Sequence, residues 1–546
     1  MRWVSVVVLL AVAGVPVAAG VTGGVMAGFH SEAWRALLST PGLGRSMALS
    51  AWSGTVATVI GVALAHLALA QAWTSRWSGR LRALSLPLLA SPHLALAIGL
   101  VLLLSPSGLV LRLLSPWATG FVQPPDWRIV QDSLGLALIG GLVIKETPFI
   151  ILVLLGALAQ VDAERLMMQA NTLGYGRLKA WLVAVAPLLH RQARVALAAV
   201  LVFGVTNVEM ALPLGPTAPP TLSILLLRWF TAADLAVRPR AFAGTWLLLA
   251  ITVGCLAATL AAATLAKRLW RRWATNGARA LEDSAARRGI SVVTMALLGT
   301  GLWALVALVL RSAGGAWRFP RLVPKEVSLG AWRNVAPDLG ASVATTVEIG
   351  LFTAAVAVAV VLIGAEALHD RPQTLRRVGF ALFVPLLLPQ MAFLFGWQVL
   401  LVRSGLDGTR FAVSWTHSVF ALPYVWSILA TARSTLDPGY LVTARLLGAS
   451  PIRAWFSVTA PLLLRSILLA AAFAFAVSVA VYLPTLFAGA GRVATLATEA
   501  AAAIGSGNLR SAAVSAAAQA LAPLATFGTA LLASHRLFRH RRGVPR

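Results

Sequence analysis

A few polar and ionisable residues lie inside long apolar stretches of this 546-residue sequence, and they are its first candidates for chemistry. Asn207, Glu209 and Tyr482 interrupt two such stretches, and His93 and Gln390 each follow a proline in two others. Polar groups in apolar surroundings are costly and usually face a cavity or a partner group. We therefore predict that these five side chains line a common path. Two alternatives stay open: Glu209 could reach the outer surface, and His93 and Gln390 could satisfy carbonyls that the prolines leave free.

The motifs of enzymes that carry their own catalytic machinery are missing. The sequence has no GxxxxGK[ST] loop to hold ATP phosphates, no HExxH and no CxxC, and its eight histidines are scattered. Lys145 and Glu146 are adjacent, so they cannot face one way on a helix, and we do not assign them to a site. Cys255 is the only cysteine, which excludes an intrachain disulfide. We expect a chain that is not an enzyme and binds no cofactor or metal itself.

The composition predicts an all-α membrane protein. The chain is 59% hydrophobic and 12% charged, with a mean hydropathy of +0.82. Apolar stretches of about 20 residues, long enough to cross a bilayer, recur along its whole length. The predicted spans are 3–26, 46–70, 84–105, 133–158, 192–213, 241–265, 290–310, 341–366, 379–402, 411–432, 465–487 and 512–534. Residues 2–20 could instead form a cleaved signal peptide, but a retained helix completes a count of twelve.

The net charge of +27 is better explained by topology than by nucleic acid. Lys and Arg gather in the loops on one side of the predicted bilayer, which is the cytoplasmic side by the positive-inside rule. The segment 267–289 and the C-terminal tail carry the densest clusters, including Arg279, Arg539, Arg541, Arg542 and Arg546. With twelve spans, both termini are expected in the cytoplasm. Contact with anionic membrane lipid is expected, and nucleic acid is not.

The sequence contains two copies of one plan. "LGYGRLKAWLVAVAPLL" at 173–189 returns as "LGASPIRAWFSVTAPLL" at 447–463, and nine of the twenty positions in 170–189 match 444–463. We predict a first half at 1–266, a basic linker at 267–289 and a second half at 290–546. Each half then has six spans in the same orientation, which makes a parallel repeat.

The repeated phrase predicts a helix, a turn and a second helix on the cytoplasmic side. Gly174 and Gly448 suit the left-handed residue that ends a helix. Pro187 and Pro461 suit the first turn of the following span, where no backbone donor is needed. A tryptophan beside Lys179 or Arg453 would then lie at the membrane interface.

These phrases resemble the cytoplasmic "EAA" loop of the integral membrane subunits of type I ABC importers. That pattern places Glu-Ala-Ala three residues before a Gly, and a hydrophobic–Pro element follows. Here the triplets read Met-Gln-Ala at 168–170 and Val-Thr-Ala at 442–444, so the last Ala and the Gly are kept and the Glu is absent. The resemblance implies coupling loops at about 162–190 and 436–464. The coupling residues that it implies are Ala170, Leu173, Gly174, Lys179, Pro187, Ala444, Leu447, Gly448, Arg453 and Pro461.

The resemblance implies a permease with several partners. Two copies of a cytoplasmic ABC ATPase would bind the loops and use ATP and Mg²⁺. An extracytoplasmic solute-binding protein would dock on outer loops near Pro219, Thr221 and Thr495. The chain looks closest to fused permeases of the iron(III) and thiamine group, in a bacterial cytoplasmic (inner) membrane, and "MALPLGPTAPPTLSILLLRW" at 210–229 resembles its thiamine branch. Thiamine is the first expected solute and iron(III) the second.

One alternative of another class is a secondary transporter of the major facilitator type, which also has twelve spans in two parallel halves. It predicts an acidic residue with an Arg in the loop between spans two and three. That loop reads "QAWTSRWSGRLRAL" and contains no acid. The repeated Gly-to-Pro loop also has no role in such a transporter.

Overall fold

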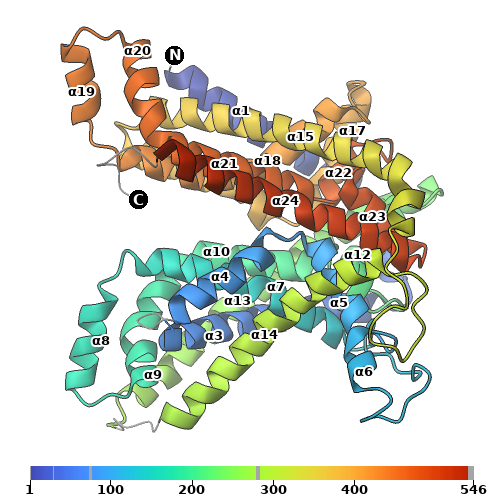
Figure 1. Cartoon of the computed structure of the whole chain (residues 1–546). Helices are drawn as coiled ribbons and strands as arrows, with labels where there is room; N and C mark the ends of the chain where they lie inside the picture. The colour runs from blue at the N-terminus through green and yellow to red at the C-terminus, as the bar shows by residue number, and fades with distance from the viewer. Residues whose placement is uncertain (1, 29, 73–76, 278–282, 539–546) are drawn as a thin grey trace.

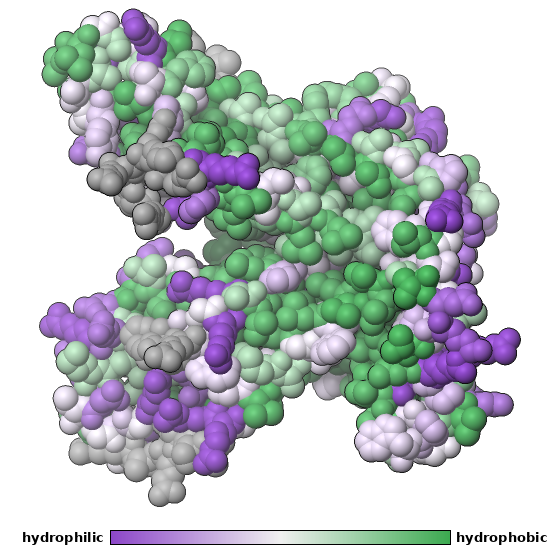
Figure 2. All heavy atoms as spheres, in the orientation of Figure 1, coloured by the Kyte–Doolittle hydropathy of each residue, from purple (hydrophilic) through white to green (hydrophobic). Residues whose placement is uncertain are grey.

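The computed structural model describes residues 2–28, 30–72, 77–277 and 283–538, and it is an all-α, multi-span membrane fold (Figure 1). Among these residues, extended pairing is limited to one bridge between Gly314 and Val327. The middle of the linker, at 278–282, lies outside the described residues, as do Arg539, Arg541, Arg542 and Arg546 of the C-terminal tail. Figure 2 shows apolar side chains across the middle of the molecule and polar ones gathered toward its two ends.

Most helices of the first part have a counterpart at the same place in the order of the second part. The first part contains α1 (Arg2–Gly28), α2 (Ser31–Leu38), α3 (Leu43–Ala72), α4 (Trp77–Ala90), α5 (His93–Leu104), α6 (Leu109–Leu114), α7 (Leu136–Leu158), α8 (Ala163–Thr172), α9 (Arg177–Ala180), the π-helical turn η1 (Trp181–Val185), α10 (Ala186–Thr206), α11 (Ala211–Leu214), α12 (Leu222–Phe230), the 3-10 turn η2 (Leu235–Val237) and α13 (Arg238–Ala274). The second part contains α14 (Asp283–Ala313), α15 (Gly330–Leu368), α16 (Pro372–Phe383), the 3-10 turn η3 (Val384–Leu387), α17 (Gln390–Arg403), α18 (Arg410–Ser434), α19 (Gly439–Leu446), α20 (Pro451–Ala454), the π-helical turn η4 (Trp455–Thr459), α21 (Ala460–Ala480), α22 (Leu483–Ala488), α23 (Leu496–Gly505) and α24 (Leu509–Phe538).

The described residues contain 10 helices that are long and apolar enough to cross a membrane. The pair Pro372–Leu387 and Gln390–Arg403, bent by 94°, is an eleventh candidate. The predicted span 411–432 is the 25-residue helix α18, whose apolar residues alternate with Ser, Thr, His and Arg. Helix α1 begins, and α24 ends, at the end of the molecule that carries α8 and α19 (Figure 1). We call this the α8/α19 end.

The predicted limits of spans five and eleven are wrong. The fifth helix is continuous from Arg177 to Thr206, and the eleventh from Pro451 to Ala480, so both begin and end earlier than 192–213 and 465–487. Beyond Thr206 and Ala480 the chain leaves the helix and forms the short helices α11 and α22. The apolar sequence continues through both breaks, and this is why hydropathy alone extended the spans over them.

The first helix of each half packs mainly on the other half. Helix α1 lies along α17 and also contacts α15 and α18, and α14 lies along α5 and contacts α4 and α7. Helix α1 approaches α17 at glycines: a Cβ added at Gly20 would lie 2.0 Å from the Phe393 carbonyl oxygen, and one at Gly396 would lie 2.1 Å from the Gly20 carbonyl oxygen. The two halves are therefore joined by exchanged helices as well as by the linker.

Candidate functional site

A cavity of about 260 Å³ lies between the two halves, near the breaks in their helices. Its walls come from α4, α5, α7 and α10 of the first half and from η3, α17, α18, α21 and α24 of the second. Three of the five predicted path residues, His93, Glu209 and Gln390, line it together. On the α8/α19 end, Figure 2 shows the two lobes of the molecule separated by a deep notch.

The first polar part of the wall is built at the break between α4 and α5. Pro92 follows Ser91 there, and the ammonium group of Lys145 on α7 donates hydrogen bonds to the carbonyls of Leu88 (2.7 Å), Leu89 (3.3 Å) and Ser91 (2.5 Å). These carbonyls belong to the end of α4, whose last turn has no helical donors left. Lys145 is only 4% exposed, so this contact compensates the burial of its charge.

The alternative role considered for His93, satisfying a freed carbonyl, is therefore wrong for this residue: Lys145 makes those bonds. His93 Nε2 instead lies 3.0 Å from the Glu146 Oε1 atom, and its ring packs 4.6 Å from that of Phe203, centroid to centroid. Adjacent in sequence, Lys145 and Glu146 point to different partners on α4 and α5. No local signal in the sequence singles them out, because their partners are 53 to 57 residues away.

The second polar part lies at the break after α10. Glu209 is 5% exposed and faces the cavity, so it does not reach the outer surface. Its carboxylate interacts with the charge of His93 and with the backbone near Glu209 itself, Val208 and, from the second half, Tyr482. Asn207 and Tyr482 are not among the lining residues. The Asn207 Oδ1 atom accepts N–H bonds from Met210 (2.7 Å) and Ala211 (3.3 Å), so its side chain caps the turn that leads into α11.

Gln390 is the second half's counterpart of His93, since each follows the proline at a helix break. Its Oε1 atom is buried and has no hydrogen-bond partner among the residues that the structure describes. A buried acceptor without a partner is uncommon and calls for an explanation. Because Gln390 lines the cavity, a ligand donor would provide that partner.

The loops that carry the repeated phrase have the predicted turn. Gly174 and Gly448 have φ of +82° and +88°, and each follows the end of a helix. In the first loop, the N–H groups of Tyr175 and Gly174 bond to the carbonyls of Ala170 (3.1 Å) and Asn171 (2.9 Å). The second loop repeats both bonds, from Ala449 to Ala444 (3.1 Å) and from Gly448 to Arg445 (3.0 Å).

This pair of hydrogen bonds is the Schellman motif, in which a left-handed residue closes the last turn of a helix. It explains which residues the two phrases share: Ala170 and Ala444 supply the accepting carbonyls, and the glycines supply the positive φ. The prediction that the glycines end these helices is confirmed.

The prediction for the two prolines is wrong in one respect. Pro187 and Pro461 do not open a span, because helix already precedes each of them from Arg177 and Pro451. A proline inside a helix lacks a donor and clashes with a carbonyl one turn earlier. The π-helical turns η1 and η4 directly precede α10 and α21, in whose first turn the prolines lie, and such wider turns can relieve the clash.

The two loops differ in their surroundings. In the first loop, Lys179 is 1% exposed. Its ammonium group donates to the Oδ1 atom of Asn276 (3.1 Å), which follows α13, and lies 5.0 Å from the ring centre of Trp273, in the last turn of α13. Trp181 is fully buried within the protein, so its ring does not contact lipid. In the second loop, the counterpart Arg453 is exposed.

The outward face of the second loop is also more apolar. Leu446, Leu447 and Ile452 are 82%, 83% and 73% exposed. In the first loop, Leu173 is 59% exposed. Large exposed apolar groups of this kind mark surfaces that bind other proteins or membranes.

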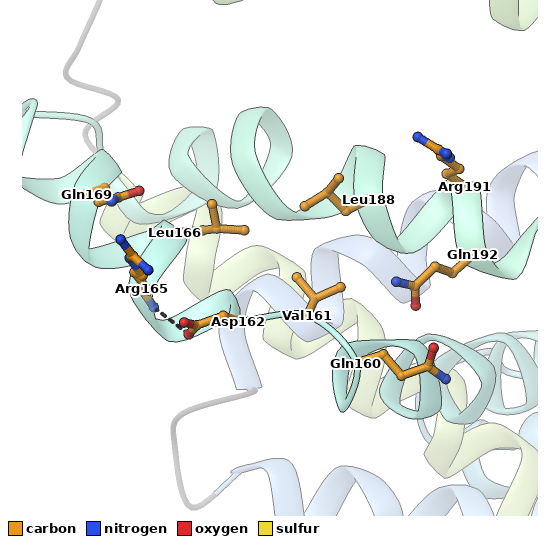
Figure 3. A pocket seen from close by; sticks show the side chains of 9 residues that line it. All are labelled: Gln160, Val161, Asp162, Arg165, Leu166, Gln169, Leu188, Arg191 and Gln192. Atoms are coloured by element: carbon orange, nitrogen blue, oxygen red, sulfur yellow. Dashed lines mark hydrogen bonds between the residues drawn. The ribbon is translucent and has the colours of Figure 1, made fainter. Parts of the chain in front are cut away.

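A hollow of about 680 Å³ lies between α8 and α10 of the first half (Figure 3). Arg165 and Gln169 approach it from α8, and Arg191 and Gln192 from α10. At its edge, the Arg165 backbone N–H donates to the Asp162 Oδ1 atom (3.2 Å), which caps α8. The hollow shows that α8 is separated from the span beside it by solvent-accessible, polar space.

The residues predicted to dock a binding protein are placed unfavourably for direct contact. Thr221 and Thr495 are 3% and 4% exposed and cap α12 and α23, with Thr495 in a reciprocal capping box. Both side chains face inward, and that of Thr495 also accepts a hydrogen bond from the Thr498 backbone N–H. Pro219 is half-buried and follows a cis peptide bond.

Comparison with known proteins gives a consistent result. No family model matches the chain. The chain is 29% identical over 505 residues to the inner membrane ABC transporter permease protein YnjC of Escherichia coli, covering 92% of this chain and 90% of that protein. It is 27% identical over 167 residues to the spermidine/putrescine transport system permease protein PotC homolog of Mycoplasma genitalium, covering 30% of this chain and 58% of that one. Nearly the whole chain is thus similar to an inner membrane permease component of an ABC transporter.

Proposed function

We propose that this chain is the fused permease subunit of a type I ATP-driven importer, with the central cavity as part of its solute path. The observation that carries the proposal is the pair of matching helix–glycine–helix loops on the two sides of the notch at the α8/α19 end. A partner with two ATPase sites requires two such contacts, and one chain provides both. The similarity to YnjC over 92% of the chain supports the same class.

In this proposal the α8/α19 end faces the cytoplasm. The first and last helices have their chain ends there, and the basic residues that flank the linker belong to the same side of the predicted topology (Figure 1). The notch at this end then makes the structure an inward-facing state. ATP binding by two partner subunits would draw the loops together and open the opposite end, where a solute-binding protein delivers its cargo. Hydrolysis would restore the inward-facing state.

The missing glutamate of the EAA pattern limits what the loops offer to a partner. Gln169 and Thr443 stand in the middle of the two triplets, and neither triplet contains an acid. The contact would therefore rest on shape and on exposed apolar side chains, chiefly Leu173 and Leu447. Burial of such side chains stabilises an interface without a salt bridge.

We keep thiamine as the first candidate solute and iron(III) as the second. Two carboxylates, Glu146 and Glu209, line the cavity, while its one ammonium group, that of Lys145, is directed at backbone carbonyls, and this favours a positively charged solute. A bare metal ion fits less well, since the described residues contain no group of three or more His, Cys, Asp or Glu placed to hold one.

Gentle purification of the chain from native membranes, followed by mass spectrometry, tests the proposed class. We expect an ABC ATPase and an extracytoplasmic binding protein to copurify with it. A chain that reproducibly purifies alone, together with uptake driven by an ion gradient without ATP, would reject the proposal in favour of a secondary transporter.

A further inference from the structure

The charged groups of the cavity all come from one half of the chain. His93, Lys145, Glu146 and Glu209 belong to the first half. The repeat offsets place Gln390, Phe420, Ala421 and Leu483 at the corresponding positions of the second half, and none of these can be charged. A symmetric dimer would carry every charge twice. The fused chain instead has one charged wall and one neutral wall.

The neutral wall carries four of the six Phe and Tyr rings that line the cavity, and the charged wall carries the other two, Phe149 and Phe203. Phe420, Phe473 and Phe527 line the cavity from α18, α21 and α24, and the last two meet edge to face with their ring centres 4.9 Å apart. Tyr424 adds a fourth ring from α18. Aromatic faces attract both apolar groups and cations, so this wall suits an apolar body that carries positive charge.

The charged wall is left with unbalanced negative groups. Lys145 directs its ammonium group to three backbone carbonyls of the α4 end. His93 contacts one oxygen of Glu146 and also interacts with the charge of Glu209, so the two carboxylates share one imidazole. Carboxylates in an apolar cavity are costly without a countercharge. A cation in the cavity would provide it.

Resting on the proposed function, we propose that the cavity takes a small organic cation with an apolar, ring-sized body, bound in one orientation. Its charged group lies between Glu146 and Glu209 of the first half, and its body packs on Phe420, Phe473 and Phe527 of the second. The cavity volume of about 260 Å³ restricts the ligand to a small molecule. Gln390, whose Oε1 atom has no partner in the described part of the chain, accepts a hydrogen bond from it.

Equilibrium binding of benzyltrimethylammonium to the purified full chain in lipid nanodiscs tests the charge requirement. We expect saturable binding that Glu146→Gln and Glu209→Gln each weaken about tenfold or more, because each removes one countercharge in a low-dielectric site. Glu326→Gln is the matched control, since Glu326 is exposed on a loop remote from the cavity and its loss should change nothing. Each variant is first checked for an unchanged gel-filtration profile.

Competition by uncharged and negative analogues tests the charge requirement on the unmodified protein, and one variant of the aromatic wall tests the orientation. Benzyl alcohol and benzoate, a neutral and a negative analogue, should not compete with benzyltrimethylammonium. Phe473→Ala should weaken benzyltrimethylammonium several-fold and leave tetramethylammonium unchanged.

Absence of saturable cation binding, competition by benzoate equal to that by the cation, or unchanged affinity in both glutamine variants would each overturn the proposal. None of these results would affect the copurification of an ATPase, so failure of the ligand assignment is separable from failure of the proposed function.

Discussion

At the residue scale, Lys145 is the side chain on which the geometry of the cavity most depends. It joins α7 to the broken end of α4 through three carbonyls, and the adjacent Glu146 holds His93 on α5. One pair of neighbouring residues thus fixes both sides of the break at Pro92. We regard Lys145 as a positioning residue, since its ammonium group is directed at the backbone.

Lys145→Met should destabilise the protein, because it leaves the carbonyls of Leu89 and Ser91 without donors, while the Ser91 hydroxyl still bonds to the Leu88 carbonyl. Losing such bonds costs about 1–3 kcal/mol in general, so we expect a clear fall in the midpoint of thermal unfolding, followed by tryptophan fluorescence. Lys325→Met is the matched control, because Lys325 is exposed on a loop. An unchanged midpoint for Lys145→Met would contradict the role assigned to the ammonium group.

Local contacts of a residue could be predicted from the sequence, and long-range contacts could not. The prediction for Gly174 and Gly448 succeeds because a Schellman turn is local: its donors and acceptors lie within six residues. The role of Lys145 could not be predicted, because its partners lie 54 to 57 residues away and only the packing of α7 on α4 brings them within reach. His93, Glu209 and Gln390 were chosen as costly polar groups, and that criterion identifies residues without saying what they contact.

At the element scale, the two loops share one backbone conformation but differ in their contacts with the rest of the protein. The end of α13 and the residues after it hold the first loop through Trp273, Asn276 and Lys179. The second loop shows Arg453 to solvent and has no buried residue in α19. We infer that the first loop is the more ordered of the two before any partner binds.

Backbone hydrogen exchange measures this difference. Lys179→Ala should speed exchange across 163–186, because it removes the contact that ties α9 to α13. Arg453→Ala should leave exchange across 439–460 unchanged, since the exposed guanidinium makes no comparable contact. Equal effects of the two substitutions would show that the loops are supported alike.

The prolines show why element boundaries were the weakest sequence prediction. Pro187 and Pro461 are ordinary signals for a helix start, and the sequence does not show that a π-helical turn just before each of them lets the helix continue. The breaks at Pro92 and Pro389 fall where prolines predict a kink, yet the second one bends the chain by 94°, far more than a simple proline kink.

At the scale of the whole molecule, exchanged helices hold the halves together. The sequence predicted the all-α membrane fold, because long apolar stretches are a direct signal. It could not show that α1 packs on α17 and α14 on α5, since the apolar surface of a helix does not specify which other helix it contacts. The glycines at the crossing are the one local trace of that packing.

Gly20→Leu should therefore weaken the second half through α1. An added side chain would meet the Phe393 backbone, which cannot move aside as a flexible side chain could. Gly14→Leu on the same helix is the matched control, because nothing lies within 4 Å of a Cβ there. We expect a lower thermal midpoint and faster proteolysis of α17 for Gly20→Leu only. Equal stability of the two variants would mean that α1 does not pack on α17 in this way.

The central claim is that both loops contact an ATPase, and site-specific photo-crosslinking in native membranes tests it most directly. A photoreactive amino acid would replace Leu173 or Leu447, with Trp117, 77% exposed in the loop that follows α6 at the opposite end, as the control position. The account predicts adducts with the same ATP-binding chain from both loop positions and none from position 117. Loop positions that give no adduct with an ATP-binding chain, while the protein is folded in the membrane, would contradict it.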